Sequence, residues 1–150
     1  MILVVDNLSG KMSDLRQMLN TLEVDYEVKR YDSKVCLDDF NGVILSGRRL
    51  SSPDTNRFNS RIIRYAESRD IPLLGICYGG EVLATTFGGS LIRLDKRIDQ
   101  FVNIRVNLGN SLTQDRRSLD VCCRRRLQIS HLPDKLIPLS SSKLSVYEIV

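Results

Sequence analysis

The sequence predicts an α/β protein, an open three-layer sandwich with a mostly parallel central sheet and an antiparallel C-terminal portion. Short apolar runs without alternation occur at residues 1–5, 42–46 and 72–76, as is typical of strands covered on both faces. Amphipathic segments separate these runs, and strands alternating with helices imply right-handed crossovers in a parallel sheet. From about residue 91 the pattern changes to short alternating pieces separated by polar turns, which indicates antiparallel strands.

The first helix is expected over residues 13–22, with Ser13 as its N-cap. Its apolar face would be formed by four residues with helical spacing, Leu15, Met18, Leu19 and Leu22. Residues 26–31 alternate in polarity and predict a half-exposed strand.

A second helix is predicted to start at Ser52-Pro53, because serine is a good N-cap and proline suits the first helical position. Its buried face would hold Phe58, Ile62, Tyr65 and Ala66. A third helix should follow Cys77 and end at Gly88-Gly89. Beyond it, short antiparallel strands are expected at three places, residues 91–93, 102–106 and 127–129.

Length and composition fit one domain spanning residues 1–150. With 42% hydrophobic residues, no apolar run long enough to cross a bilayer and no secretory leader, we expect a cytoplasmic protein without a membrane partner. Four cysteines without CxxC spacing and the single histidine, His131, predict that there is no metal site, and no cofactor is implied.

The net charge of +4 is unevenly distributed, since residues 93–126 hold nine basic side chains against four acidic ones. The cluster Arg116–Arg126 could dock an acidic partner or nucleic acid. A solvated surface that discourages strand pairing is the commoner origin of such charges, so we favour it and do not expect a nucleic-acid partner.

The segment most suited to chemistry is Gly75-Ile76-Cys77-Tyr78-Gly79, where an apolar strand breaks and a helix resumes. This layout places a thiol on a sharp strand-to-helix turn, beside the backbone N–H groups of the helix start. Those groups can lower the pKa of a thiol and hold an oxyanion, and the flanking glycines allow the backbone to bend. Cys77 is therefore the candidate nucleophile, and the elbow layout argues against the alternative, a buried cysteine with an inert sulfur.

These residues resemble the nucleophile motif of class I (triad) glutamine amidotransferases, with a flavodoxin-like fold, and most closely the amidotransferase subunits of archaeal GMP synthases. The resemblance spans essentially the whole chain. It includes Val82-Leu-Ala, Gly88-Gly89, Ile2-Leu-Val-Val-Asp-Asn7, Gly42-Val-Ile-Leu-Ser-Gly47, Ser130-His131, Leu132-Pro133 and Leu139-Ser-Ser141.

The resemblance implies that Cys77 attacks the side-chain amide of glutamine and that the ammonia released passes to a synthetase partner of the ATP-pyrophosphatase type. It further implies that the Tyr78 N–H and the Gly47-Arg48 backbone bind the oxyanion. Three further positions would fall at the substrate pocket, Gly79, Glu81 and His131. In the family a histidine oriented by a glutamate moves the protons.

The chain departs from the family pattern at three points. Gly47-Arg48-Arg49 replaces a turn with two glycines and a proline, and the Arg48 side chain would restrict the backbone dihedrals there. Glu81 stands where the family has glutamine, so its charge would raise the pKa of the thiol. The Phe-His-Pro-Glu-like segment that carries the catalytic histidine and glutamate is absent from the 150 residues, which end in an apparent strand and look shortened.

Three functions therefore compete. The first is a glutaminase component of a larger enzyme, active in a longer form or with a base supplied by a partner. The second is a catalytically inactive relative that serves as a binding or regulatory module, and the third is another cysteine-elbow α/β protein, such as a protease or chaperone built on the same sandwich. Covalent capture of Cys77 by a glutamine-like electrophile would favour the first, and a salt-sensitive complex the second.

Overall fold

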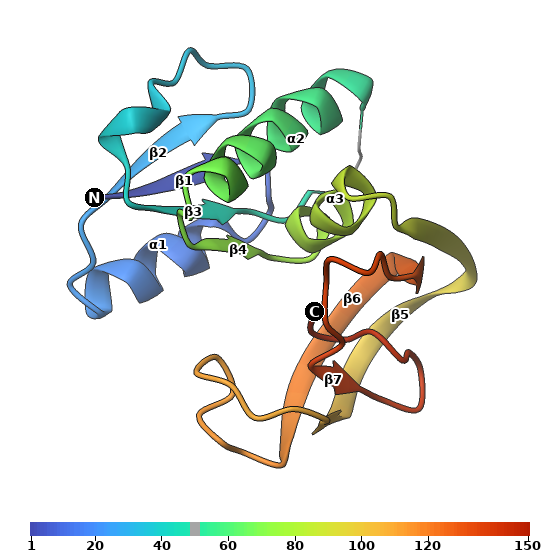
Figure 1. The fold of residues 1–150 in the computed structure, drawn as a ribbon. Coiled ribbons are helices and arrows are strands. Elements are labelled where there is room, and N and C mark those ends of the chain that lie inside the picture. The colour runs from blue at the N-terminus through green and yellow to red at the C-terminus, as the bar shows by residue number, and fades with distance from the viewer. Residues whose placement is uncertain (49–51) are drawn as a thin grey trace. The chain divides into compact units, whose positions relative to one another are not determined.

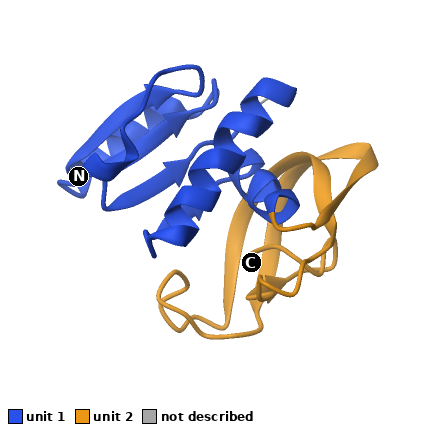
Figure 2. Cartoon of the chain, turned by 45° about the horizontal axis from the view of Figure 1, so that its top comes forward, with its two compact units in different colours: residues 1–86 blue, residues 87–150 orange. Residues whose placement is uncertain are grey.

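The protein is described by a computed structural model that covers residues 1–48 and 52–150. Its contacts group into two compact units, residues 1–86 and 87–150 (Figure 2). The expectation of one domain over the whole chain stays a prediction.

The first unit alternates strands and helices, as expected. Its elements in chain order are β1 (Ile2–Asp6), α1 (Met12–Thr21), β2 (Tyr26–Arg30), the short 3-10 helix η1 (Leu37–Asp39), β3 (Gly42–Leu45), α2 (Pro53–Ser68), β4 (Leu73–Gly75) and α3 (Tyr78–Thr86). The four strands are all parallel and lie in the order β2-β1-β3-β4. This is the start of a doubly wound sheet, in which ligands bind beyond the carboxyl ends of the strands.

Helices cover both faces of this sheet, with α1 on one face and α2 on the other (Figure 1). Val4 pairs with Ile44 across β1 and β3, and both pack against Leu15 and Leu19 of α1. The alternate residues of the two strands point to the opposite face, where Leu45 is fully buried. Because both faces are covered, these strands are apolar throughout, which confirms the interpretation of their unalternating runs.

Two predicted features of the first helix are wrong in detail. Helix α1 begins at Met12, one residue before Ser13, and no side chain caps it. Met18 and Leu22 were expected on its buried face but are 50% and 63% exposed. Helix α2 starts as predicted, with the Ser52 hydroxyl accepting the N–H of Thr55.

The buried face of α2 is rotated relative to the prediction. It consists of Thr55, Asn59, Ile62, Ile63 and Ala66, whereas Phe58 and Tyr65 are only half-buried. Strand β4 was expected to be buried, but it is an edge strand of the described sheet, and Leu74 is 38% exposed. Helix α3 ends at Thr86, and Gly88 then adopts a positive φ of 98°.

The second unit is an antiparallel sheet in the order β6-β5-β7, made of β5 (Ser90–Val106), β6 (Ser118–His131) and β7 (Ser140–Ser141). The prediction of short strands was wrong, because β5 and β6 are long and pair along most of their length. The pairing of β5 with β6 shifts register after Ser90 and between Arg93 and Ile98. These irregularities interrupt the alternation of the sequence, which is why separate short strands were predicted.

The arginines of β6 do not form one surface, because successive strand residues point to opposite faces. Arg124 is exposed and donates from Nε to Asp99 Oδ1 at 2.8 Å. Arg125 points the other way and makes a two-pronged ion pair with Glu148, whose side chain is only 4% exposed. One of the three consecutive arginines is thus part of the interior.

None of the helices in residues 1–48 and 52–150 is long and apolar enough to cross a membrane. Within the same ranges no three His, Cys, Asp or Glu side chains cluster as metal ligands would.

Candidate active site

Cys77 lies between the end of β4 and the start of α3, and its side chain is exposed. Its backbone has a φ of +53°, in the left-handed region that costs a residue with a Cβ about 1–2 kcal/mol. A strained residue on a strand-to-helix turn is the geometry of a nucleophile elbow. The thiol is therefore presented to solvent, and the alternative of a buried Cys77 is wrong, while its reactivity stays a prediction.

Close packing of glycines holds this bend. A Cβ on Gly79 would lie 2.4 Å from the carbonyl oxygen of Leu45. A Cβ on Gly75 would lie 2.6 Å from the carbonyl carbon of Gly79. Both positions therefore require glycine, because only glycine lets β3, β4 and the start of α3 approach this closely. Gly79 thus permits a close approach of two backbone segments, and its role at a substrate pocket stays a prediction.

The turn after β3 lies beside Cys77. A Cβ placed on Gly47 would be 3.6 Å from both Cys77 Cβ and Ser9 Oγ. The next residue, Arg48, lies with its guanidinium 4.6 Å from the centre of the Tyr31 ring. The expected effect of the Arg48 side chain on the backbone of this turn stays a prediction. Arg49, the second departure from the family at this turn, lies outside the described residues.

A buried amide pair fixes the ends of β1 and β3 to α2. Asn7 and Asn59, both fully buried, exchange hydrogen bonds between their side chains at 2.8 and 3.1 Å. Asn7 also donates to the Ser46 carbonyl at 3.0 Å, and its backbone N–H donates to the Ser46 hydroxyl at 2.9 Å. Because Ser46 immediately precedes Gly47, this network sets where the turn begins.

The residue after Cys77 is anchored by its side chain. Tyr78 is only 3% exposed, and its hydroxyl donates to Asn56 Oδ1 on α2 at 2.7 Å. Burial raises the pKa of Tyr78 to about 12, a rise that Glu81 adds to and Arg48 opposes. The hydroxyl therefore remains a neutral donor at all physiological pH values.

Two backbone amides at the elbow are already used within the turn. The N–H of Gly79 donates to the Ile76 carbonyl, and the N–H of Glu81 donates to the Cys77 carbonyl, both at 3.0 Å. Tyr78 is the first residue of α3, and the first N–H groups of a helix have no acceptor within the helix. The Tyr78 N–H is thus the candidate donor from the elbow.

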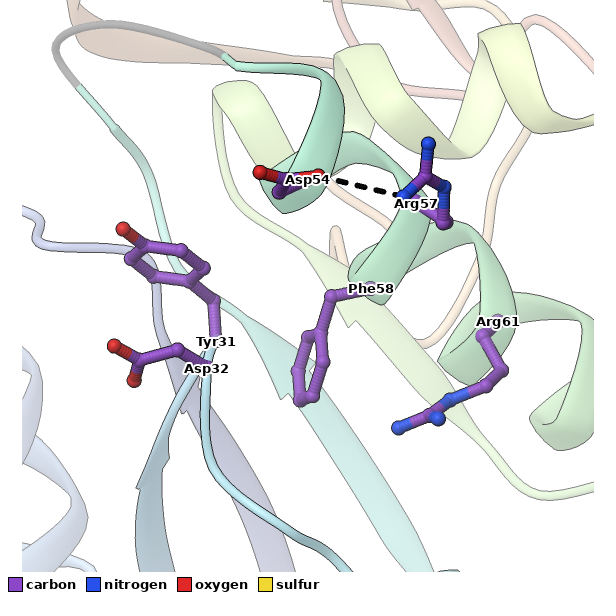
Figure 3. A pocket seen from close by; sticks show the side chains of 6 residues that line it. All are labelled: Tyr31, Asp32, Asp54, Arg57, Phe58 and Arg61. Atoms are coloured by element: carbon purple, nitrogen blue, oxygen red, sulfur yellow. Dashed lines mark hydrogen bonds and ion pairs between the residues drawn. The ribbon is translucent and has the colours of Figure 1, made fainter.

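Described residues of the first unit line cavities at two places. One of about 240 Å³ opens next to the elbow and is lined by Gly47, Ile76, Ser9 and Met12, among others. The other, of about 280 Å³, lies between the residues after β2 and the first half of α2, where Tyr31 and Phe58 face it with charged neighbours (Figure 3). The ion pair between Asp54 and Arg57 borders this second cavity.

Two further residues were expected at the substrate pocket, Glu81 and His131. Glu81 lies one helical turn after Cys77 and is half-buried. His131 is the last residue of β6, in the second unit, and is exposed. The roles of both residues at a pocket stay predictions.

Sequence reasoning missed Asn7, Ser46, Asn56 and Asn59. A signal for Asn59 was present, since it shares the helical face of Ile62, Ile63 and Ala66, and a buried amide requires partners.

The sequence of this chain is similar to a known protein family and to individual known proteins. The family described as "Glutamine amidotransferase class-I" matches residues 3–150. Anthranilate synthase component 2 of Cyanophora paradoxa is 31% identical over 119 residues, 77% of this chain and 62% of that protein. One subunit of the glutamine-hydrolyzing GMP synthase of Methanococcoides burtonii is 35% identical over 91 residues, 59% of this chain and 46% of that protein.

Solved structures show the same fold. A putative GMP synthase subunit from Thermoplasma acidophilum superposes with a TM-score of 0.80 at 24% identity, covering 95% of this chain and 72% of that one. A glutamine amidotransferase from Thermotoga maritima gives the same TM-score at 17% identity, covering 96% and 67%. The chain spans between about half and two thirds of the two curated relatives described above. Since the family match covers nearly every residue, the chain belongs to the class I glutamine amidotransferases.

Proposed function

We propose that this chain is a glutaminase subunit that releases ammonia from glutamine through Cys77. The observation that carries the proposal is the exposed thiol held at a φ of +53° where α3 begins. In this reaction the thiolate attacks the side-chain amide carbon of glutamine, and the carbonyl oxygen becomes an oxyanion. Collapse of that intermediate expels ammonia and leaves a glutamyl thioester, which water hydrolyses to glutamate and the free thiol.

The oxyanion would be held from two sides. The Tyr78 N–H at the start of α3 is one donor, and the backbone of the Gly47-Arg48 turn is the other. Support comes from the 3.6 Å spacing between Cys77 Cβ and a Cβ position on Gly47. Donors fixed before the reaction stabilise the developing charge without reorganisation.

The thiol proton must go to a base that later protonates the leaving ammonia. Residues 1–86 contain no histidine, so a histidine base must come from another part of the protein or from a partner chain. We infer that Cys77 and such a base act as a unit, since removal of either member of a pair of this kind removes most of the rate.

The partner would be a synthetase that consumes the ammonia. The relatives include a component of anthranilate synthase and a subunit of a GMP synthase, and the name of the second describes it as glutamine-hydrolyzing. We favour a GMP synthase-like role in purine biosynthesis, in which the ammonia acceptor is a synthetase of the ATP-pyrophosphatase type.

A second candidate is a catalytically inactive module that keeps the fold for binding or regulation. The observation in its favour is the carboxylate of Glu81, one turn after the nucleophile, whose charge contributes to the raised pKa of Tyr78. A negative charge this close to the elbow opposes the formation of both a thiolate and an oxyanion.

A glutaminase assay separates the two candidates. Glutamate and ammonia are measured with the purified chain and with its Cys77→Ala variant, each with and without a synthetase of the ATP-pyrophosphatase type. Activity that depends on Cys77 supports the glutaminase. Equal background in both proteins under both conditions rejects catalysis by this chain and favours the inactive module.

A further inference from the structure

We propose that Asn56 is a positioning residue for the oxyanion site, because it holds the Tyr78 side chain and thereby aims the Tyr78 N–H. The inference rests on the proposed function, in which that N–H stabilises the charge that forms when Cys77 attacks a carbonyl carbon. Asn56 itself touches neither the thiol nor the substrate.

The need for such a residue follows from the strain at the elbow. Cys77 is held in a left-handed conformation that is less favourable than an ordinary one for a residue with a Cβ. A turn of this kind relaxes unless its surroundings fix it. Relaxation would rotate the peptide group between Cys77 and Tyr78, which carries the candidate donor.

The hydrogen bond from the Tyr78 hydroxyl to Asn56 opposes this rotation. It measures 2.7 Å and joins the first residue of α3 to α2. The Tyr78 ring is buried, so its backbone is fixed at one end of a rigid side chain and its hydroxyl at the other. Since burial keeps the hydroxyl protonated, the bond persists across the pH range in which a thiol reacts.

Helix α2 is a firm support for this bond. The N–H of Asn56 donates to the Ser52 carbonyl at 2.9 Å, in the first turn of the helix that Ser52 caps. One turn later, Asn59 fixes the strand ends that lead to Gly47. The same two turns of α2 therefore hold both proposed donors, one through Asn56 and the other through Asn59.

Asn56 is also a good site for substitution, because its side chain lies on the exposed side of α2. Asn56→Ala removes the acceptor of the Tyr78 hydroxyl, whereas Asn56→Asp keeps an acceptor oxygen. A matched control is Asn20→Ala, which removes the same kind of bond elsewhere, since Asn20 Oδ1 accepts from the Tyr26 hydroxyl at 3.0 Å.

The test compares two reactions of Cys77 that differ in their need for an oxyanion site. p-Nitrophenyl acetate acylates a thiol through a tetrahedral oxyanion, and iodoacetamide alkylates it by direct displacement without one. Both rates are measured by peptide-resolved mass spectrometry, with the exposed Cys122 as an internal reference in the same sample. Urea unfolding of each variant reports its stability.

In the wild type we expect the ratio of acylation to alkylation to be higher for Cys77 than for Cys122. Asn56→Ala should lower the acylation rate of Cys77 about tenfold and leave its alkylation rate within about twofold of the wild type. The reason is that a displaced donor stabilises the oxyanion less, and only acylation forms an oxyanion. Asn56→Asp should restore most of the acylation rate, and Asn20→Ala should resemble the wild type.

The inference is overturned if Asn56→Ala acylates like the wild type, if both rates fall together, if Asn56→Asp fails to restore the rate, or if Asn20→Ala has the same effect. A wild-type ratio no higher at Cys77 than at Cys122 would instead reject the oxyanion site, and with it both the proposed function and this inference.

Discussion

Gly79 lies so close to Leu45 that a Cβ atom on it would be 2.4 Å from the Leu45 carbonyl oxygen. The contact joins the first turn of α3 to the end of β3 through backbone atoms, which cannot move aside as a flexible side chain could. The bend that exposes Cys77 therefore depends on a position without a side chain.

Gly79→Ala should destabilise the protein by about 2 kcal/mol or more, because the added methyl group forces β3 and α3 apart. The matched control is Gly80→Ala, one residue further along α3, where the nearest atom to an added Cβ is the Gly75 carbonyl oxygen at 3.4 Å. There the higher helix propensity of alanine should offset any cost. Urea unfolding of both variants checks this, and equal stabilities would contradict the packing described.

Stability at high pH should report the burial of Tyr78. Burial raises its pKa to about 12, compared with 10 in the unfolded chain. As the pH rises from about 10 to about 12, the unfolded chain loses this proton while the folded protein keeps it, so up to about 2.7 kcal/mol of stability is lost. Tyr78→Phe lacks this loss.

Below pH 10 the wild type should therefore be more stable than Tyr78→Phe by about 1 kcal/mol, the net value of a hydrogen bond. Above pH 10 the difference should shrink and then reverse. Urea unfolding of both proteins from pH 8 to 11.5 measures it. A constant difference in the free energy of unfolding across this range would contradict a raised pKa of Tyr78 in the folded protein.

The ion pair between Arg125 and Glu148 should matter more than the exposed pairs of the same sheet. The two side chains are 14% and 4% exposed, and Arg125 Nη2 donates to Glu148 Oε1 at 2.9 Å. Glu148→Gln leaves the guanidinium charge buried without its counter-ion, and we expect a loss of about 3 kcal/mol. Asp99→Asn, which breaks the exposed pair with Arg124, should cost less than about 1 kcal/mol.

Thermal or urea unfolding of these two variants measures both losses of stability. Similar small losses in both would mean that Arg125 finds water or another acceptor when Glu148 is neutral.

The amide pair of Asn7 and Asn59 should likewise be sensitive to substitution. Asn59→Ala removes the donor to Asn7 Oδ1, which is fully buried, and we expect a loss of about 2–3 kcal/mol. Asn103→Ala is the control, because it removes an exposed amide bond to Asp120 at 2.8 Å and should cost less than about 1 kcal/mol. Losses of the same size in both variants would contradict a structural role for the buried pair.

The sequence was sufficient to predict the strands of the first sheet and the elbow at Cys77. The apolar run at residues 42–45 predicted a strand covered on both faces, and these residues form β3. Ser52-Pro53 predicted a helix start, and α2 begins there with Ser52 as its N-cap. The left-handed bend at Cys77 agrees with the change from strand to helix at that residue.

The parts that sequence reasoning missed depend on contacts between distant residues. Asn7 and Asn59 are 52 residues apart, and the pattern of either segment alone does not show that they meet. The exposure of Leu74 follows from the place of β4 at an edge of the described sheet, which its own composition does not reveal. The long strands β5 and β6 were divided in the prediction because irregular pairing interrupts their alternation.

The most direct test of the account is the reaction of Cys77 with a chloroketone built on the carbon skeleton of glutamine. We predict that this reagent alkylates Cys77 at a rate that saturates with its concentration, that glutamine protects the thiol, and that the exposed Cys36 and Cys122 react slowly and without protection. Modification of Cys77 no faster than that of Cys36 and Cys122, with no protection by glutamine, would contradict the claim that this elbow presents a nucleophile to glutamine.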